Sequence, residues 1–193
     1  MRIIGGMAGG RLLKVPKGFG VRPTPDLVRQ AVFNSLGARV QGARVLELFA
    51  GTGALSLECL SRGAARAVCV ERSNRHAGFL RQNLATTLLD AARVEVRVRD
   101  AFTALAQLAA AGRQFDLILA DPPYGEKNVG RRSTSVAQQL LDDLNLPLLL
   151  AAGALFVLGH ARRDTLDVPD IWEEAKILRH GDTVMRLLQK AAG

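Results

Sequence analysis

Apolar and polar residues alternate in blocks along most of the chain, and the apolar blocks are short. Four of these blocks are largely apolar, at residues 45–50, 67–71, 115–120 and 154–159. Runs of this kind are typical of strands that are buried on both faces of a parallel sheet. Residues 94–99 instead alternate strictly between valine and charged residues, which is expected of an edge strand with one solvated face.

Amphipathic stretches lie between these strands and predict helices. The expected helices span residues 53–62, 73–89, 101–111 and 133–150. Pro147 should break the last of them. Two further strands, near 174–179 and 183–189, are joined by a turn at 179–182, so one of them should run antiparallel. The predicted fold is therefore a doubly wound, Rossmann-like α/β sheet, mostly parallel with one antiparallel C-terminal strand.

The first 24 residues do not follow this pattern. Residues 3–6 and 9–16 predict two short strands around a glycine turn, which form a β-hairpin. A hairpin of this length has little core of its own, so we expect it to lean on the main domain. We accordingly divide the chain into an N-terminal arm, residues 1–24, and one domain over residues 25–193.

A helix is expected to follow the arm directly. Thr24 is predicted as its N-cap and Pro25 as its first helical residue, with Gly37 at its end. The predicted buried stripe of this helix consists of Leu27, Val28, Ala31, Val32 and Leu36.

The charge of the chain is strongly positive and unevenly placed. Lys and Arg number 26 against 18 Asp and Glu, which gives a formal net charge of +8. An excess of this kind favours a polyanion partner, because neutralised phosphates release their counterions. The arm holds five cations and no acid, so it accounts for five of the eight net charges. We predict RNA contacts from Arg2, Arg11, Lys14, Lys17 and Arg22 of the arm and from Arg131 and Arg132 further along. A merely solvated loop is the alternative for Arg131 and Arg132.

Several protein classes are excluded by composition. Hydrophobic residues make up 48% and charged residues 23% of the chain, which indicates a soluble globular protein. Cys59 and Cys69 lie in apolar stretches without metal-ligand spacing, so both are expected in the core. His76, His160 and His180 are isolated in the sequence and are expected as surface or strand-end residues. Neither a signal peptide nor a membrane span is indicated, and we expect a cytoplasmic monomer.

The first chemical signal follows the first predicted strand, at residues 47–54. Gly51 and Gly53 allow a tight turn and a close approach of backbone to a ligand, in front of a helix N-terminus. A dinucleotide-binding fingerprint would need a third glycine where Ser56 stands, so that fingerprint is incomplete. A nicotinamide-dependent oxidoreductase is therefore disfavoured.

Two acids end the next strands. Glu71 lies 20 residues after Gly51, where a carboxylate can accept hydrogen bonds from both hydroxyls of a ribose. Asp100 ends the edge strand, where it can either cap the following helix or reach an adenine.

The most specific signal is Asp121-Pro122-Pro123-Tyr124, directly after a buried strand. The prolines fix the backbone and leave peptide carbonyls without neighbouring N–H partners. Asp121 and the Pro122 carbonyl can then accept hydrogen bonds from an exocyclic amine, and Tyr124 offers a ring on which a base can stack.

Taken together, these motifs resemble class I S-adenosylmethionine-dependent methyltransferases that act on an amino nitrogen. More narrowly, the chain resembles the RsmD family of 16S ribosomal RNA guanine-N2 methyltransferases. The matching pieces are residues 2–6, 10–11, 22–24, 48–55, 61–64, 121–124 and 181–183. The glycine loop and residues 121–124 mark the superfamily, whereas the N-terminal pieces and Ser61-Arg62-Gly63-Ala64 mark the family.

The resemblance implies a role for each matching residue. For the cofactor, S-adenosylmethionine, it implies contacts with Glu47, Phe49, Gly51, Gly53, Glu71, Asp100 and Asp121. The target guanine would be held by Asp121, Pro122 and Tyr124, as the catalytic residues, and no metal is implied. The partner implied is 16S ribosomal RNA within the small ribosomal subunit.

Three alternatives remain open at this stage. A similar site serves methyltransferases of DNA adenine N6 and of protein glutamine. A non-catalytic ribosome assembly factor could also keep this scaffold. The residues do not decide whether Asp121 takes a proton or only accepts a hydrogen bond.

Overall fold

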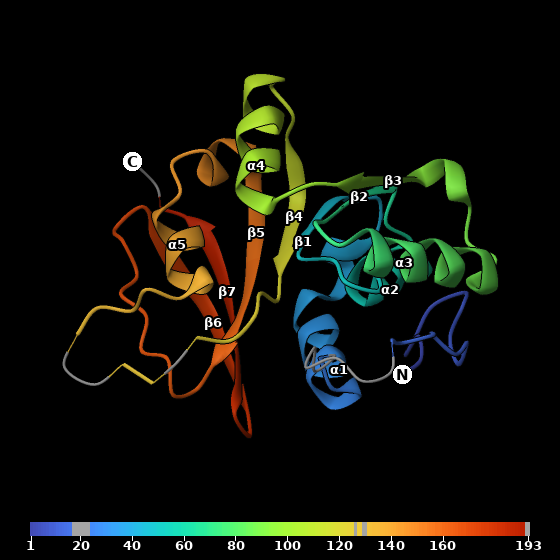
Figure 1. The fold of residues 1–193 in the computed structure, drawn as a ribbon, viewed down its shortest axis with the longest axis horizontal. Coiled ribbons are helices and arrows are strands. Elements are labelled where there is room, and N and C mark those ends of the chain that lie inside the picture. Colours follow the sequence, from blue (N-terminus) through green and yellow to red (C-terminus); the bar gives the residue numbers. More distant parts are fainter. Residues whose placement is uncertain (17–23, 126, 129–130, 192–193) are drawn as a thin grey trace.

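The computed structural model describes residues 1–16, 24–125, 127–128 and 131–191. Within them, seven strands form one sheet in the order β3-β2-β1-β4-β5-β7-β6 (Figure 1). The strands are β1 (Arg44–Leu48), β2 (Arg66–Glu71), β3 (Val94–Val98), β4 (Phe115–Ala120), β5 (Leu150–Ala161), β6 (Trp172–His180) and β7 (Thr183–Lys190). The pairs from β3 to β5 are parallel, and β7 is antiparallel to both of its neighbours. The predicted fold class is confirmed, including the edge position of β3.

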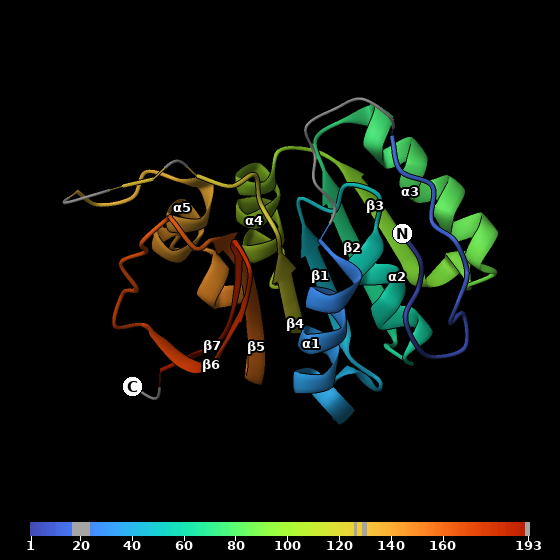
Figure 2. The ribbon, with the colours of Figure 1, turned by 90° about the horizontal axis from the view of Figure 1, so that it is seen from below.

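Helices cover both faces of this sheet (Figure 2). The helices α1 (Asp26–Leu36), α2 (Ala54–Ser61) and α3 (Asn74–Thr87) pack on one face, together with apolar residues of the arm. The other face is covered by α4 (Ala101–Ala110), α5 (Val136–Asp142) and the short 3-10 helix η3 (Leu146–Leu149). The predicted helix over 133–150 is interrupted near Pro147 as expected, but at residues 143–145, between the end of α5 and the start of η3, and Pro147 lies in the first turn of η3.

The order of the strands reverses beside β1. The chain runs outward from β1 to β2 and β3 and then returns to β4 on the other side of β1. A crevice opens at such a switch point, outside the carboxyl ends of the strands, because the adjacent connections leave in opposite directions. Two of the predicted site motifs, the glycine loop after β1 and residues 121–124 after β4, therefore meet at this switch point.

The arm forms less regular structure than the sequence predicts. Within residues 1–16, the part of the arm before the gap in the described chain, a single antiparallel bridge joins Arg2 and Leu12, and no pair of strands forms. The backbone hydrogen bonds from Ile3 N to Arg11 O (2.9 Å) and from Gly10 N to Ile3 O (2.9 Å) hold the turn together. The arm buries Ile3, Ala8 and Leu13 in the core that contains α1, α2 and α3, so it leans on the rest of the protein as predicted.

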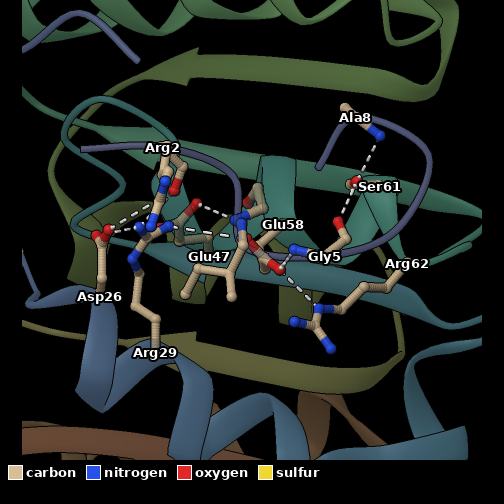
Figure 3. A network of polar contacts seen from close by, with 11 residues as sticks. Arg2, Gly5, Ala8, Asp26, Arg29, Glu47, Glu58, Ser61 and Arg62 are labelled. Carbon is tan, nitrogen blue, oxygen red and sulfur yellow. Dashed lines mark hydrogen bonds and ion pairs between the residues drawn. The ribbon is translucent and has the colours of Figure 1, made fainter. Parts of the chain in front are cut away.

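Buried polar groups of α2 fasten the arm in place (Figure 3). The carboxylate of Glu58 accepts hydrogen bonds from the backbone N–H groups of Ile4 (2.7 Å) and Gly5 (2.9 Å). Ser61 Oγ accepts from Ala8 N (2.9 Å) and donates to Gly5 O (2.6 Å). Residues 61–64 were singled out in the sequence only by resemblance, and their first residue serves to dock the arm.

The helix α1 departs from its prediction at both its start and its buried face. Its N-cap is Pro25 and not Thr24, whose hydroxyl is used elsewhere. Leu27 was predicted to be buried and is 69% exposed, whereas Arg29 is fully buried. Arg29 Nη2 donates to Arg2 O (2.6 Å) and to Asp26 Oδ1 (2.7 Å), and Nη1 lies 3.8 Å from Glu58 Oε2. A charged residue can occupy this inward position because a buried carboxylate of α2 faces it.

Two further predictions concern the core and the membrane. Cys59 and Cys69 are both buried and free, as expected of core residues. Across the described part of the chain, no helix has the length and apolar character needed to cross a membrane.

Candidate functional site

A pocket opens at the switch point between β1 and β4. Its walls come from the glycine loop, from the end of β4 and from both ends of the arm. The lining residues are Met1, Val15, Pro16, Thr24, Glu47, Phe49, Ala50, Gly51, Thr52, Ala54, Leu55, His76 and Asp121. Four of the predicted cofactor contacts, Glu47, Phe49, Gly51 and Asp121, are thus brought together in one wall.

The glycine loop between β1 and α2 is tightly turned. Gly51 and Gly53 have φ angles of 54° and 79°, and Phe49 has a φ of 56°, which is rare for a residue with a side chain. Gly53 is the N-cap of α2, and a Cβ there would lie 2.7 Å from Leu80 Cγ. Gly53 is buried, so it shapes the loop from behind and does not appear in the pocket wall.

Glu47 is a buried acid at the base of the pocket. One carboxylate oxygen accepts a hydrogen bond from Ser56 N at 3.0 Å, across the first turn of α2. Burial disfavours the charged form and raises the pKa of Glu47 to about 7, although the hydrogen bonds to Ser56 oppose the shift. Near neutral pH, Glu47 can therefore be present as a carboxylate or as a carboxylic acid, and in either form it can accept a hydrogen bond from an N–H or O–H group of a ligand.

Glu71, at the end of β2, supports the glycine loop. Its two oxygens accept hydrogen bonds from Gly51 N (2.8 Å) and Ser73 N (2.8 Å), and His76 Nδ1 lies 3.7 Å from Oε1. The predicted ribose acid is thus adjacent to the pocket but not part of its lining. Asp100 is exposed and caps α4, where its side chain accepts from Phe102 N (3.0 Å) and Thr103 N (3.2 Å). The capping function considered for Asp100 is present.

Asp121 is the acid that reaches the pocket from the end of β4. Its Oδ2 accepts a hydrogen bond from the hydroxyl of Thr24, and its Oδ1 is enclosed without a hydrogen-bond partner in the described structure. Burial raises the pKa of Asp121, and hydrogen bonds from Thr24 and Tyr124 counteract that rise. A Cβ on Gly159 of β5 would lie 2.3 Å from Oδ1, so only glycine there leaves room for the carboxylate.

The residues after Asp121 form the rim of a second cavity. Tyr124 is half-buried, and its hydroxyl lies 3.1 Å from Thr183 Oγ1 of β7. This cavity is lined by Pro123, Tyr124, Gly125, Lys127, Asn128, Arg131, Arg132, Ser133, Thr134, Ser135 and Val136. Arg131 and Arg132 are exposed beside it, and Arg132 also pairs with Asp142 (2.8 Å) and Asp167 (3.2 Å). Pro122 is buried and lines neither of these two cavities.

The predicted basic residues of the arm can be placed in part. Arg2, Arg11 and Lys14 are exposed, and Arg11 Nη1 also donates to Thr86 O at 3.3 Å. Lys17 and Arg22 lie outside the described residues. Val15 and Pro16, which line the pocket, directly follow the exposed Lys14 in the sequence. The basic part of the arm is thus continuous with the pocket wall.

Two parts of the site could not be anticipated from the sequence. The arm was expected to bind RNA, yet Met1, Val15 and Pro16 also form pocket wall. Thr24 belongs to a stretch matched by resemblance, but a threonine before proline indicated a helix cap and not a partner of Asp121. His160 lines neither cavity; it lies at the end of β5, as expected of a strand-end residue, but it is buried, with Nδ1 2.9 Å from Ala161 O and Nε2 accepting from Arg186 (3.0 Å).

The site offers hydrogen-bond acceptors and a concave wall. Among the described residues, no group of three or more His, Cys, Asp or Glu side chains could hold a metal ion. A buried acceptor without a donor, Asp121 Oδ1, marks the place where a ligand N–H would complete the hydrogen bonding.

Comparisons with known proteins match nearly the whole chain. The family model described as Conserved hypothetical protein 95 matches residues 1–189. "Ribosomal RNA small subunit methyltransferase D" of Escherichia coli strain K12 is 34% identical over 192 residues, which cover 100% of this chain and 91% of that protein. The solved structure "Putative methyltransferase yhhF from Escherichia coli" superimposes with a TM-score of 0.79 at 35% identity and covers 100% of this chain and 99% of that one.

A more distant structure carries a ligand related to the cofactor expected from the sequence. It is "Crystal structure of SMU.776, a putative methyltransferase complexed with SAH", with a TM-score of 0.65, 16% identity and coverage of 84% of this chain and 48% of that one. At this identity the likeness extends to the fold alone.

Proposed function

Because this chain belongs to the Conserved hypothetical protein 95 family, the RsmD family, we propose that it methylates ribosomal RNA with S-adenosylmethionine. The methyl acceptor that we propose is the exocyclic N2 of a guanine in small-subunit, 16S, ribosomal RNA. The name of the full-length E. coli relative supports the RNA class, and the Asp-Pro-Pro-Tyr turn supports an amino nitrogen as the acceptor.

One observation carries the amino acceptor. Asp121 places an enclosed, unpartnered carboxylate oxygen in the wall of a pocket that is open to ligands. An exocyclic amine has two N–H donors, so it can satisfy that oxygen and still present nitrogen to an electrophile. Carbonyl or ether oxygens of a substrate have no donor to offer and would leave Oδ1 unsatisfied.

The pocket residues fit a nucleoside with an attached amino acid. The turn through Gly51 lets the loop backbone come close to a ligand, and Glu47 can pair with an ammonium group in the pocket wall. Glu71 and Asp100 lie on the side of β2 and β3, where we propose contacts with the ribose and the adenine. When bound, S-adenosylmethionine supplies an electrophilic methyl group on a sulfonium.

The chain itself contributes orientation and hydrogen bonding. Asp121 and the Pro122 carbonyl accept from the amine and orient its nitrogen toward the methyl group, and Tyr124 stacks on the unpaired base. Positioning of two reactants can contribute roughly 7–11 kcal/mol to lowering a barrier. We propose that it supplies most of the rate enhancement here, with the proton leaving to Asp121 or to water.

The RNA partner is supported by charge. Exposed Arg2, Arg11 and Lys14 lie on the arm, whose next residues line the pocket, and Arg131 and Arg132 flank the second cavity. These groups contact phosphates and do not read sequence, so we propose that folded RNA within an assembled or assembling small subunit is the substrate. The protein would act as a monomer in the cytoplasm.

The assay that tests the proposal is methyl transfer from labelled S-adenosylmethionine to four acceptors. The acceptors are small ribosomal subunits lacking the modification, the matching naked RNA, duplex DNA and a protein extract. We expect label on RNA as N2-methylguanine, with the subunits favoured over naked RNA. Label on DNA adenine or protein glutamine instead would contradict the RNA assignment, and absence of both transfer and cofactor binding would favour a non-catalytic assembly factor.

Replacing Arg2, Arg11 and Lys14 together by Gln should weaken RNA binding and reduce its salt dependence. Each lost phosphate contact lowers the slope of log K against log salt by about 1, so a decrease of about 2–3 is expected. Cofactor affinity should not change. The matched control replaces Arg39, Lys176 and Arg179 by Gln. These three are exposed cations outside the arm, so the control removes the same net charge from a different place. An equal loss in both triple variants would indicate that net charge, and not the arm, attracts the RNA.

A further inference from the structure

Thr24 joins the end of the arm to the acid of the proposed site. Its hydroxyl donates to Asp121 Oδ2 across 97 residues of sequence, and both residues line the same pocket. The threonine is half-buried, so its hydrogen bond is only partly exposed to competing water. The contact uses one oxygen of the carboxylate and leaves Oδ1 as the oxygen without a partner.

The carboxylate of Asp121 is restricted on its other side as well. Oδ1 lies against Gly159 of β5, where a Cβ would approach it to 2.3 Å and would lie 3.1 Å from Met185 Sδ of β7. The carboxylate is therefore held between the Thr24 hydroxyl, which binds Oδ2, and Gly159, whose lack of a side chain leaves room for Oδ1. Tyr124 also hydrogen-bonds this carboxylate, but the Thr24 hydroxyl has the larger effect of the two on Asp121 and is the partner of Oδ2.

We propose that Thr24 is a positioning residue for methyl transfer, which holds Asp121 in the rotation and the ionised form that accept the target amine. This inference rests on the proposed function and deepens it, because it makes the end of the arm part of the catalytic geometry. The arm then serves the reaction in addition to any contact it makes with RNA.

The electrostatic consequence has a definite sign. The hydrogen bond from Thr24 stabilises the carboxylate and lowers the pKa of Asp121, against the rise caused by burial. Removing the hydroxyl therefore raises that pKa, and a larger share of Asp121 is protonated at low pH. Among the described residues, the other titratable groups that line this pocket are Glu47, His76 and the α-amino group of Met1. Tyr124 hydrogen-bonds Asp121 from the rim of the second cavity, and Gly159 of β5 and Met185 of β7 do not titrate.

The test compares Thr24→Val, which removes the hydroxyl but keeps a similar shape, with Thr24→Ser, which restores it. We expect kcat for methyl transfer to small subunits to fall about 10-fold to 100-fold in Thr24→Val, in keeping with one hydrogen bond to a charged group. The acidic limb of the kcat profile should move to higher pH, whereas KM for S-adenosylmethionine stays within about two-fold of wild type. Thr24→Ser should recover most of the rate and the original profile.

Thr86→Val is the matched control, because it makes the same change at an exposed position on α3 whose hydroxyl bonds only Asn83 O in the described structure. It should leave kcat unchanged. The inference is overturned if Thr24→Val keeps the wild-type kcat and pH profile, or if it loses cofactor affinity and kcat in parallel with no shift of the profile. A wild-type protein that transfers no methyl group would instead contradict the proposed function.

Discussion

Asp121→Ala is expected to lower the rate of methyl transfer at least about 100-fold, with the affinity for S-adenosylmethionine within about two-fold of wild type. General acid–base catalysis and directed hydrogen bonding each contribute about 10²–10⁴ to enzymatic rates. Asp121 is the acid whose oxygen is both enclosed and unpartnered in the pocket. The other predicted cofactor contacts stay in place, so binding should persist while chemistry is lost. Single-turnover transfer and calorimetric binding measure the two quantities separately.

Asp121→Asn distinguishes the two roles left open for the carboxylate. An amide keeps an acceptor oxygen but cannot take a proton at neutral pH. If acceptance of a hydrogen bond is the role, Asn should keep more activity than Ala. If proton transfer is required, the two variants should be equally slow. Parallel loss of cofactor affinity and turnover in both variants would contradict the assigned role of Asp121.

The same variants should not be less stable than the wild type. The carboxylate is buried with one oxygen unsatisfied, and burial raises its pKa, so its charged form is unfavourable in the folded state. A group of this kind is retained for function at the expense of stability. The urea midpoint of Asp121→Asn should therefore equal or exceed that of the wild type, which separates lost chemistry from lost structure.

The sequence predicts the sheet and one half of the pocket because the signals for both are local. Runs of apolar residues such as 115–120 specify buried strands, and β4 spans just these residues. In a parallel sheet the carboxyl ends of the strands meet at one edge, so the positions of Glu47 and Asp121 follow from the order of the elements. The glycine loop could likewise be identified from two glycines at fixed spacing.

The other half of the pocket could not be predicted, because its contacts join residues that are far apart in sequence. The partner of Thr24 lies 97 residues away, and its position before Pro25 equally suits a helix cap. Arg29 occupies an inward position of α1, where hydrophobic periodicity favours an apolar residue. Its burial depends on Glu58, which the sequence shows only as a polar residue in the next predicted helix.

Glu58→Gln is expected to lower the free energy of unfolding by about 3–5 kcal/mol, which is the usual effect of breaking a buried ion pair. Glu58 is fully buried. Its carboxylate accepts hydrogen bonds from the backbone N–H groups of Ile4 and Gly5 and from Arg62 Nε at 2.6 Å. It also forms an ion pair with Arg29. An amide in this place must turn its NH₂ toward some of these donors, and it leaves Arg29 paired only with the half-exposed Asp26. Denaturant unfolding with unchanged m-value measures the difference.

Glu95→Gln provides the matched control for this change. Glu95 also pairs with two arginines, Arg97 at 2.5 Å and Arg113 at 3.6 Å, but its side chain is 44% exposed. Exposed ion pairs contribute about 0–1 kcal/mol, because water and salt screen them. We therefore expect a small effect in Glu95→Gln and a large one in Glu58→Gln. Equal losses in the free energy of unfolding would contradict the idea that burial strengthens the contribution of the Glu58 ion pairs to stability.

The loss at Glu58 should reach the pocket through the arm. Glu58 binds the backbone at residues 4 and 5, and Met1, Val15 and Pro16 of the same arm line the pocket. If arm docking completes the pocket, Glu58→Gln should weaken cofactor binding, whereas Glu95→Gln should not. Linkage is reciprocal, so the cofactor should in turn slow hydrogen exchange at the amides of Ile4, Gly5 and Ala8 in the wild type. Unchanged exchange at these amides with the cofactor bound would mean that the arm and the pocket are energetically independent, despite the wall they share.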